Sequence, residues 1–327
     1  YRDVSLFDWL DEAADTHPDS VACSYHNTSI SYAAMRKKAE IIAANLRERG
    51  VGDGDRVGIM LPNLPQTMLS FWGVLKAGAV VTLINPLYME KELIHQIADA
   101  GVKHLITYDA CWPKFAKLRE ALGVEQYFVT SVAEGMSFPL NVVQRFKDRR
   151  KSGISVPFDN KHVFPFSVLL KGRRRYSAQI DNPKDSIALL QYTGGTTGLS
   201  KGAVLTHGNV AGNAQQIAAA LAYLHEKDQI FVGVLPFFHV YGLNTCLILP
   251  TLFHAKVLPI TRYVPSELLA VMKKHQATVL PGAPAMYISL LQQKNKDKFS
   301  LESLNFCICG SAPMPVEMMR QFEQAFG

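Results

Sequence analysis

The sequence predicts an α/β protein made of two α/β lobes with mainly parallel sheets. Strand-like and helix-like patterns alternate between residues 56 and 107 and again between 230 and 309, which is typical of parallel sheets. The 327 residues are 48% hydrophobic, enough to bury a large core in more than one compact unit. We therefore expect a first α/β subdomain at residues 1–137, a basic amphipathic insertion at 138–176 and a second α/β subdomain at 177–327.

A long helix is predicted near the start of the first subdomain. Ser31 is a suitable N-cap, because its hydroxyl can accept a hydrogen bond from the first turn. The apolar residues Ile41, Ile42 and Leu46 then fall mostly on one face, and Gly50 ends the helix.

The alternation that follows supplies three strands and two helices. Runs of apolar and β-branched residues predict strands at Arg56–Leu61, Val80–Leu83 and His104–Thr107. Helical patterns lie between them, at about 66–77 and 90–100. Strand, helix and strand in this order favour parallel pairing.

The second subdomain repeats this pattern. Strands are predicted at Val257–Ile260, Thr278–Leu280 and Phe306–Cys309. The uncharged stretch 230–253 exceeds the ~20 residues that a bilayer span requires. Its prolines and polar residues would break a continuous helix and be costly in lipid, so we interpret it as a buried strand, a functional loop and a buried helix.

The stretch from Tyr192 to Ala203 is the most informative feature of the chain. It holds three threonines, four glycines and one lysine, and glycines let backbone amides approach an anion while hydroxyls and the lysine add donors. Strand patterns flank it at 186–192 and 203–206, and a helix is predicted from about His207. A flexible surface hairpin would explain the glycines but not Lys201, so we expect a phosphate-binding loop.

The flanks differ from those of the common NTPase phosphate loop. That loop places a hydroxyl residue directly after the lysine and opens into a helix, whereas here Gly202 follows Lys201. The candidate nucleotide-binding residues of the loop are Tyr192, Thr193, Gly194, Gly195, Thr196, Thr197, Gly198, Leu199, Ser200, Lys201, Gly202 and Ala203.

With these flanks, the loop resembles the signature loop of the adenylate-forming superfamily, which includes acyl-CoA synthetases, 4-coumarate-CoA ligases and luciferases. Further matches follow in the expected order along the chain: Leu61–Pro65, Asn85-Pro86, the aromatic–His segment Pro236–Gly242 and the turn Gly310–Pro313. The resemblance covers essentially the whole chain and is nearest to long-chain fatty acid–CoA ligases. It implies the large N-terminal domain of the acyl-CoA synthetase-like fold.

The resemblance implies a two-step reaction with ATP, Mg²⁺ and CoA. A fatty acid would first become an acyl-adenylate with release of pyrophosphate, and the CoA thiol would then take the acyl group. Thr193, Lys201 and His239 are the expected catalytic residues, and Thr193 contributes to the metal site by resemblance. The adenine-contacting turn would comprise Gly310, Ser311, Ala312 and Pro313.

The acyl pocket is expected around the aromatic–His segment. Alone, a histidine in an apolar segment is more often a hydrogen-bonded core residue than a functional one, but the resemblance places His239 near the substrate carboxylate. Plain core packing is the alternative for its neighbours. The expected substrate-binding residues are His239, Tyr241, Gly242, Leu243, Gly282, Ala283 and Pro284.

The segment Phe138–Arg175 is strongly basic. It has ten Lys and Arg against two Asp, a net charge of +8, so the rest of a chain of net charge +6 sums to −2. Phe and Leu residues lie between the basic ones, a composition that suits docking on an anionic membrane surface. The alternative is an insertion that is simply exposed to solvent. Nucleic acid is not expected, because no RNA-recognition signature accompanies the basic residues.

The cysteines and the start of the sequence bear on where the protein is located. Five cysteines, an odd number without a zinc pattern, suit a reducing cytosol, and no secretory signal is visible. We therefore expect a cytoplasmic protein, peripheral to the cytoplasmic membrane. The resemblance adds a homodimer as an expectation.

The chain stops where the superfamily continues with a Tyr-Gly-x-Thr-Glu segment, a ribose-binding aspartate and a C-terminal domain with a catalytic lysine. We therefore expect this portion alone to be inactive in adenylation. Aryl or medium-chain acids are alternative substrates, and a non-catalytic, membrane-associated nucleotide-binding module is the alternative class of function.

Overall fold

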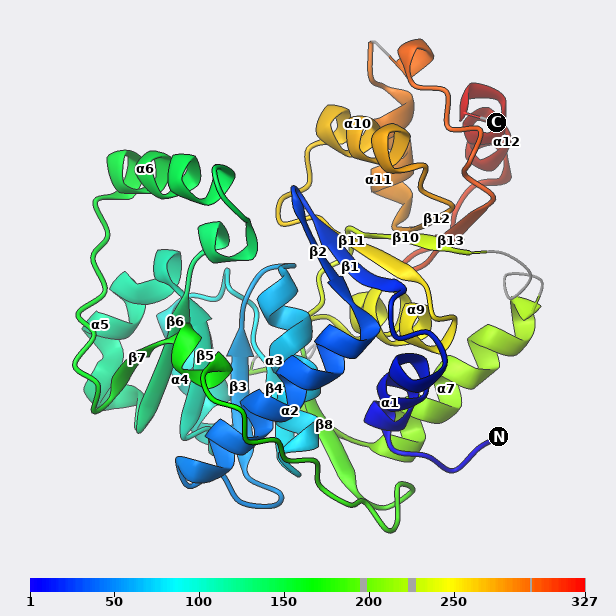
Figure 1. Cartoon of the computed structure of the whole chain (residues 1–327). Coiled ribbons are helices and arrows are strands. Elements are labelled where there is room, and N and C mark those ends of the chain that lie inside the picture. The colour runs from blue at the N-terminus through cyan, green and yellow to red at the C-terminus, as the bar shows by residue number, and fades with distance from the viewer. Residues whose placement is uncertain (195–198, 223–227, 295, 327) are drawn as a thin grey trace.

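The computed structural model contains two sheets flanked by helices (Figure 1). The structure describes residues 1–194, 199–222, 228–294 and 296–326. The helices are α1 (Leu6–Thr16), α2 (Tyr32–Glu48), α3 (Pro65–Lys76), α4 (Glu90–Ala100), α5 (Trp112–Leu122), α6 (Leu140–Ser152), α7 (His207–Ala220), α8 (Val240–Leu243), α9 (Leu249–Leu252), α10 (Pro265–His275), α11 (Pro284–Leu291) and α12 (Val316–Phe326).

The seven-stranded sheet has the order β7-β6-β5-β3-β4-β8-β9. Its pairs are parallel except for the antiparallel hairpin β8–β9. The strands are β3 (Arg56–Met60), β4 (Val80–Leu83), β5 (His104–Tyr108), β6 (Gln126–Thr130), β7 (Val163–Pro165), β8 (Ile187–Thr193) and β9 (Lys201–Thr206).

The six-stranded sheet has the order β13-β12-β10-β11-β1-β2. Only the β1–β2 hairpin at its edge is antiparallel. The strands are β1 (Val21–Tyr25), β2 (Thr28–Ser31), β10 (Ile230–Gly233), β11 (Lys256–Pro259), β12 (Val279–Gly282) and β13 (Phe306–Cys309). The predicted fold class, two mainly parallel α/β sheets, is confirmed.

The predicted elements agree with the observed ones within two residues. Ser31 caps α2 by accepting a hydrogen bond from the Ala34 backbone N–H, and Gly50 beyond the helix has a positive φ of 91°. The stretch 230–253 forms β10, a loop, α8, a short π-helical segment (Asn244–Ile248) and α9. Among the described residues, no helix has the length and apolarity that a bilayer span requires.

The two sheets do not follow the boundaries that we drew along the sequence. The N-terminal strand β1 pairs with β11 in the six-stranded sheet, whereas β8 and β9 pair into the seven-stranded sheet. The predicted insertion 138–176 also contains β7, an edge strand against β6. Local patterns identify a strand but carry no information about its long-range partner, so the sequence did not reveal this exchange.

Helix α3 joins the two sheets into one core. All its residues are buried, as expected for a helix covered on every side. Its Phe71 and Trp72 belong to one hydrophobic cluster with Val57 of β3 and Val257 of β11. At Gly73, a Cβ atom would lie 2.5 Å from Ile42 of α2, so this glycine sets the close contact between α2 and α3.

A buried ion pair closes the end of α3. The Lys76 side chain is fully buried, and its Nζ lies 2.7 Å from both carboxylate oxygens of Asp11 in α1 and 3.2 Å from Ser177 Oγ. The ammonium also lies 4.9 Å from the centroid of the Phe7 ring, a cation–π distance. Helix α1, helix α3 and the segment after residue 175 therefore meet at one charge.

We expect Asp11→Ala to lower the free energy of unfolding by about 3–5 kcal/mol, because it leaves the Lys76 ammonium buried without its counter-charge. Lys76→Met should cost less, since the Asp11 side chain is 32% exposed and can be hydrated. Urea unfolding measures both. Equal losses in the two variants, or losses no larger than in the exposed Arg2–Glu12 pair, would contradict this account.

His207 anchors the N-terminus of α1 to the start of α7. Its Nδ1 accepts a hydrogen bond of 3.1 Å from the Leu6 backbone N–H, and burial lowers the pKa of His207 to about 4, opposed by the Asp8 charge. Protonation would remove this acceptor. The unfolded chain binds the proton more readily, so stability is fully present above pH ~6.5 and is lost as the pH falls towards 4.

We expect His207→Asn, which keeps an acceptor but does not titrate, to remove an acid-induced loss of about 3 kcal/mol between pH 7 and 4. Unfolding midpoints in urea across this pH range would show it. The same pH dependence in both proteins would be evidence against the assignment.

Candidate active site

The predicted phosphate-binding loop connects β8 and β9. Thr193 and Lys201 are paired across the hairpin, and both are exposed at its end. One step back, Tyr192 pairs with Gly202, where a Cβ atom would lie 2.9 Å from the tyrosine ring. Gly194 is exposed. The remaining predicted residues Gly195, Thr196, Thr197 and Gly198 lie outside the described residues.

Helix α4 holds both ends of this loop. The Tyr192 hydroxyl donates to Asp99 Oδ2 over 2.5 Å, and the His95 Nε2–H donates to the Ser200 carbonyl oxygen over 2.8 Å. Burial and the contact with Asp99 raise the pKa of Tyr192, so it stays a donor. We did not predict His95 and Asp99; their spacing of four residues on one face of a predicted helix was the available signal.

The aromatic–His segment follows β10. His239 is exposed and caps α8, with its Nδ1 accepting a hydrogen bond of 3.3 Å from the Tyr241 backbone N–H. The Nε2 atom is therefore the one available to a substrate. At Gly242, a Cβ atom would lie 2.2 Å from the Pro236 carbonyl oxygen, so only glycine allows this turn. Leu243 is buried in the shared core.

The Tyr241 side chain links the aromatic–His segment to the segments that follow β12 and β13. Its hydroxyl lies 2.9 Å from the carbonyl oxygen of Ile308 and 3.2 Å from that of Gly282, at the carboxyl ends of β13 and β12. Its ring packs against Gly310, where a Cβ atom would lie 2.6 Å away, and the Gly310 N–H donates to the Gly282 carbonyl oxygen over 3.1 Å. Burial raises the pKa of Tyr241, which keeps the hydroxyl a donor.

Two amide side chains join the segments to the seven-stranded sheet. Gln191 of β8 donates to the Phe238 carbonyl oxygen over 3.2 Å, next to His239. Asn63, which follows β3, donates to the carbonyl oxygens of Gly233 and Leu235, both over 2.8 Å. The predicted loop and the aromatic–His segment are thereby held at neighbouring sheet edges.

The other predicted residues lie at the same edge of the six-stranded sheet. Ala283 precedes α11, Pro284 is its first residue, and Ser311 has a left-handed φ of 69°. Ala312 and Pro313 are exposed in the turn after β13. In the described part of the chain, no hydrogen bond joins Thr193 or Lys201 to the side chains of His239 or Ser311.

The candidate active site offers few protein ligands for a metal ion. Across the described ranges, no group of three or more His, Cys, Asp or Glu side chains is arranged to hold one. Thr193, the predicted metal residue, offers an exposed hydroxyl. Mg²⁺ often takes most of its ligands from substrate phosphates and water, and one hydroxyl fits that mode.

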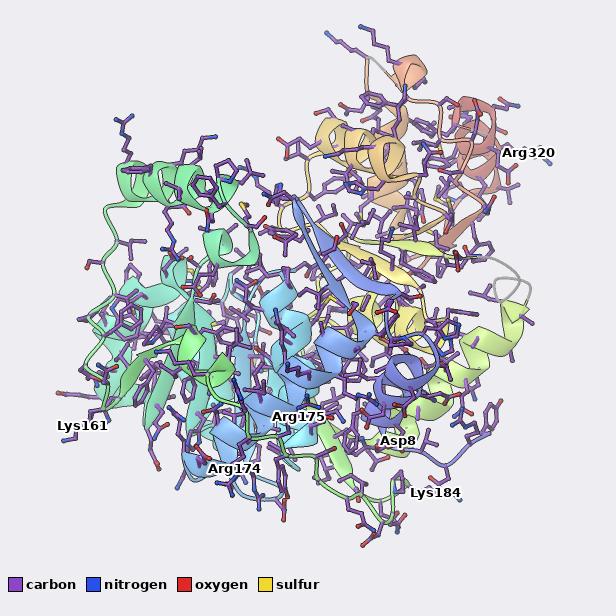
Figure 2. The ribbon with its side chains drawn as sticks, viewed as in Figure 1. Asp8, Lys161, Arg174, Arg175, Lys184 and Arg320 are labelled. Atoms are coloured by element: carbon purple, nitrogen blue, oxygen red, sulfur yellow. The ribbon has the colours of Figure 1, made fainter. Side chains whose placement is uncertain are left out.

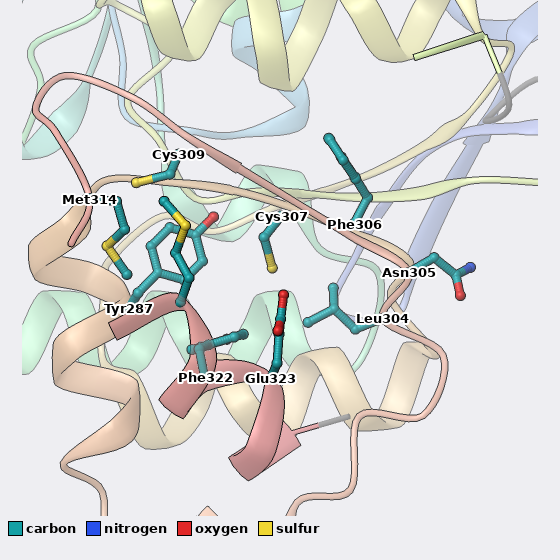
Figure 3. Close-up of a pocket in the computed structure, with 10 residues that line it drawn as sticks. Tyr287, Leu304, Asn305, Phe306, Cys307, Cys309, Met314, Phe322 and Glu323 are labelled. Atoms are coloured by element: carbon teal, nitrogen blue, oxygen red, sulfur yellow. The ribbon is translucent and has the colours of Figure 1, made fainter. Parts of the chain in front are cut away.

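A separate cavity of about 270 Å³ lies between β13 and α12 (Figure 3). None of the predicted site residues lines it. Its walls include Tyr287, Cys307, Cys309 and Phe322 (Figure 3), and burial raises the pKa of Cys307 to about 12. This thiol is protonated at neutral pH and is not a nucleophile.

Comparison with known proteins finds clear relatives. The family model described as AMP-binding enzyme matches residues 10–327. A long-chain-fatty-acid–CoA ligase of Bacillus subtilis is 36% identical over 321 residues, which cover 97% of this chain and 57% of that relative. 4-Coumarate-CoA ligase 1 of Narcissus pseudonarcissus is 28% identical over 302 residues, covering 92% of this chain and 50% of the relative.

Solved structures share the fold. An anthranilate CoA ligase in complex with anthranoyl-AMP superposes with a TM-score of 0.86 at 21% identity, covering 99% of this chain and 58% of that one. This likeness confirms the predicted acyl-CoA synthetase-like architecture. The chain spans little more than half the length of these proteins.

We expect Gly242→Ala to destabilise the protein by about 1–3 kcal/mol, because its Cβ would clash with the Pro236 carbonyl and displace the turn that carries His239. Gly212→Ala is the matched control: it lies in α7 with no atom within 4 Å of its Cβ position. That change should stabilise by up to ~1 kcal/mol. Urea midpoints would decide, and a neutral Gly242→Ala would refute the steric argument.

Proposed function

The chain belongs to the AMP-binding enzyme family, and on this basis we propose that it activates a long-chain fatty acid with ATP, releases pyrophosphate and transfers the acyl group to CoA. Sequence identity of 36% to the long-chain-fatty-acid–CoA ligase of B. subtilis supports the reaction and the substrate class. The observation that carries the proposal is the meeting of the Thr193–Lys201 hairpin and the aromatic–His segment, joined by the Gln191–Phe238 hydrogen bond.

Thr193 and Lys201 would bind the phosphates of ATP. The Lys201 ammonium and the loop amides would offset the charge that grows on pyrophosphate as it leaves. This role is electrostatic and positional, since the protein forms no covalent bond. The anchors at Asp99 and His95 hold both ends of the hairpin and reduce the cost of ordering the loop around a ligand. Thr196 and Thr197 are proposed as further donors.

The Thr193 hydroxyl would be the protein ligand of Mg²⁺, whose remaining ligands would be phosphate oxygens and water. When bound, the ion would neutralise phosphate charge. The turn Gly310–Pro313 would contact adenine, and Ser311 in this turn has a left-handed φ of 69°.

The carboxylate of the acid would lie near His239. Because Nδ1 accepts the Tyr241 N–H, a neutral His239 carries its proton on Nε2 and can donate to a carboxylate oxygen. The Tyr241 ring and the segment Gly282–Pro284 would form the start of the acyl pocket, where the short side chain of Ala283 leaves space beyond the carboxylate.

An aryl acid is the second candidate substrate. The 28% identity to 4-coumarate-CoA ligase 1 over 302 residues favours it as the alternative. Pocket depth separates the two, because a long acyl chain needs a channel that continues beyond the residues around Tyr241.

We expect acid-dependent ATP–pyrophosphate exchange by the full-length gene product to be highest with long-chain fatty acids. Lys201→Ala should lower the exchange rate about 10²–10³-fold, as when one transition-state donor is lost. Lys161→Ala, which removes an equal charge from an exposed position away from the hairpin, is the control. Exchange only with coumarate-like acids would move the substrate to the aryl class. No exchange with any acid would favour a nucleotide-binding module.

A further inference from the structure

The basic segment 138–175 separates into two parts in the fold. Arg174 and Arg175 lie along α2, with nitrogen–oxygen distances of 3.0 Å to Glu48 and 3.6 Å to Glu40. Helix α6 lies at the opposite end of the molecule, away from both arginines (Figures 1 and 2). The second part of the segment is therefore ion-paired to the body of the protein, and only α6 with its flanks is a candidate contact surface.

Helix α6 presents its apolar side to solvent. None of its described residues is buried. Val142, Val143 and Phe146, spaced for one helix face, are 41%, 47% and 64% exposed. The half-buried positions on the opposite face are polar, namely Asn141, Gln144 and Asp148. This is the reverse of the usual orientation of a surface helix.

Polar groups beneath α6 explain its inward side. A cavity of about 670 Å³ between the helix and the carboxyl ends of β5 and β6 is lined by Asp109, Glu134 and Asp148 among others. The N-terminal flank of the helix is attached to the β1–β2 turn, where Ser137 and Asn27 exchange hydrogen bonds.

Basic residues accompany the exposed apolar face. Lys147 and Arg150 are exposed on α6, and Phe138 at its N-terminal flank is 78% exposed. Arg145 and Phe158 instead line the cavity beneath the helix, where Arg145 lies 4.0 Å from Glu134. Apolar side chains framed by cations characterise helices that lie in the plane of an anionic bilayer.

The position of α6 relative to the candidate active site supports the same interpretation. Strands β6, β5, β3, β4 and β8 are parallel neighbours, so their carboxyl ends share one edge of the sheet. Helix α6 lies above β5 and β6 at this edge, and the predicted phosphate-binding loop follows β8. A surface that contacts α6 would therefore face the same sheet edge as the predicted phosphate-binding loop.

We propose that α6 with its flanking residue Phe138 is an interfacial helix that docks the protein on anionic lipid bilayers, with Val142, Val143 and Phe146 inserted among the lipids and Lys147 and Arg150 at the headgroups. The docking does not depend on the proposed ligase activity, because lipid contact requires no catalytic step. It narrows the surface expected from the sequence to the first part of the basic segment.

Co-sedimentation of the 327-residue chain with vesicles tests the proposal. We expect binding to vesicles of equal parts phosphatidylglycerol and phosphatidylcholine, weakened by salt, and much weaker binding to phosphatidylcholine alone. Lys147→Ala/Arg150→Ala should weaken binding roughly 30-fold, from ~1 kcal/mol for each cation near the surface. Absence of binding to the anionic vesicles would overturn the proposal.

The matched control is Arg174→Ala/Arg175→Ala, which removes the same charge from the same basic segment at the other end of the molecule. This control should bind within about twofold of the parent chain, because its cations lie beyond a Debye length of ~10 Å from the docked surface. Equal weakening in the two double variants would show a non-specific electrostatic effect and overturn the role of α6.

The apolar contribution has its own pair of variants. Phe146→Ser should weaken vesicle binding about tenfold, in line with the loss of one buried aromatic side chain, whereas Leu87→Ser, at a residue that is 78% exposed outside α6, should have no effect. Urea midpoints identify any variant that fails to fold. If Phe146→Ser changes the oligomeric state in sedimentation experiments and not vesicle binding, α6 is a protein contact and the proposal is wrong.

Discussion

The candidate site depends on one buried amide, the side chain of Asn63. It follows β3 of the seven-stranded sheet, yet it bonds to the chain after β10 of the six-stranded sheet, donating to Gly233 and Leu235 and accepting from the Phe237 N–H over 2.9 Å. The side chain is only 4% exposed, so each missing bond would leave a desolvated polar group at a cost of about 1–3 kcal/mol. Asn63 therefore sets where the aromatic–His segment begins.

A chain of hydrogen bonds connects Asn63 to the predicted phosphate-binding loop. The loop after β10, which Asn63 holds in place, leads to His239, and the neighbouring Phe238 carbonyl accepts a hydrogen bond from Gln191 of β8. Gln191 leads directly into Tyr192, and α4 fixes this hairpin from the other side. Carboxyl ends of strands from two sheets are thus brought together at a switch in strand order, the place where α/β proteins usually bind ligands.

The sequence predicted the local elements well and their long-range arrangement less well. Strands such as Arg56–Met60 and the cap at Ser31 depend on neighbouring residues, so their patterns identify them. The pairing of β1 with β11 joins residues more than two hundred positions apart, and no local pattern encodes it. Tyr241 was expected beside the substrate, but its contact with Gly310 could not be predicted, because it joins α8 to the turn after β13, far along the chain. Similarly, composition identified the basic segment, while only the fold shows that Arg174 faces Glu48 and Phe146 faces solvent.

A crystal structure of the full-length gene product with a non-hydrolysable ATP analogue and a fatty acid tests the central claim most directly. The account predicts the terminal phosphates beside Thr193 and Lys201, the adenine at Gly310–Pro313 and the carboxylate of the acid near His239. An analogue bound elsewhere, or a site that leaves the hairpin of β8 and β9 without phosphate contacts, would contradict the assembly of the active site from the edges of both sheets.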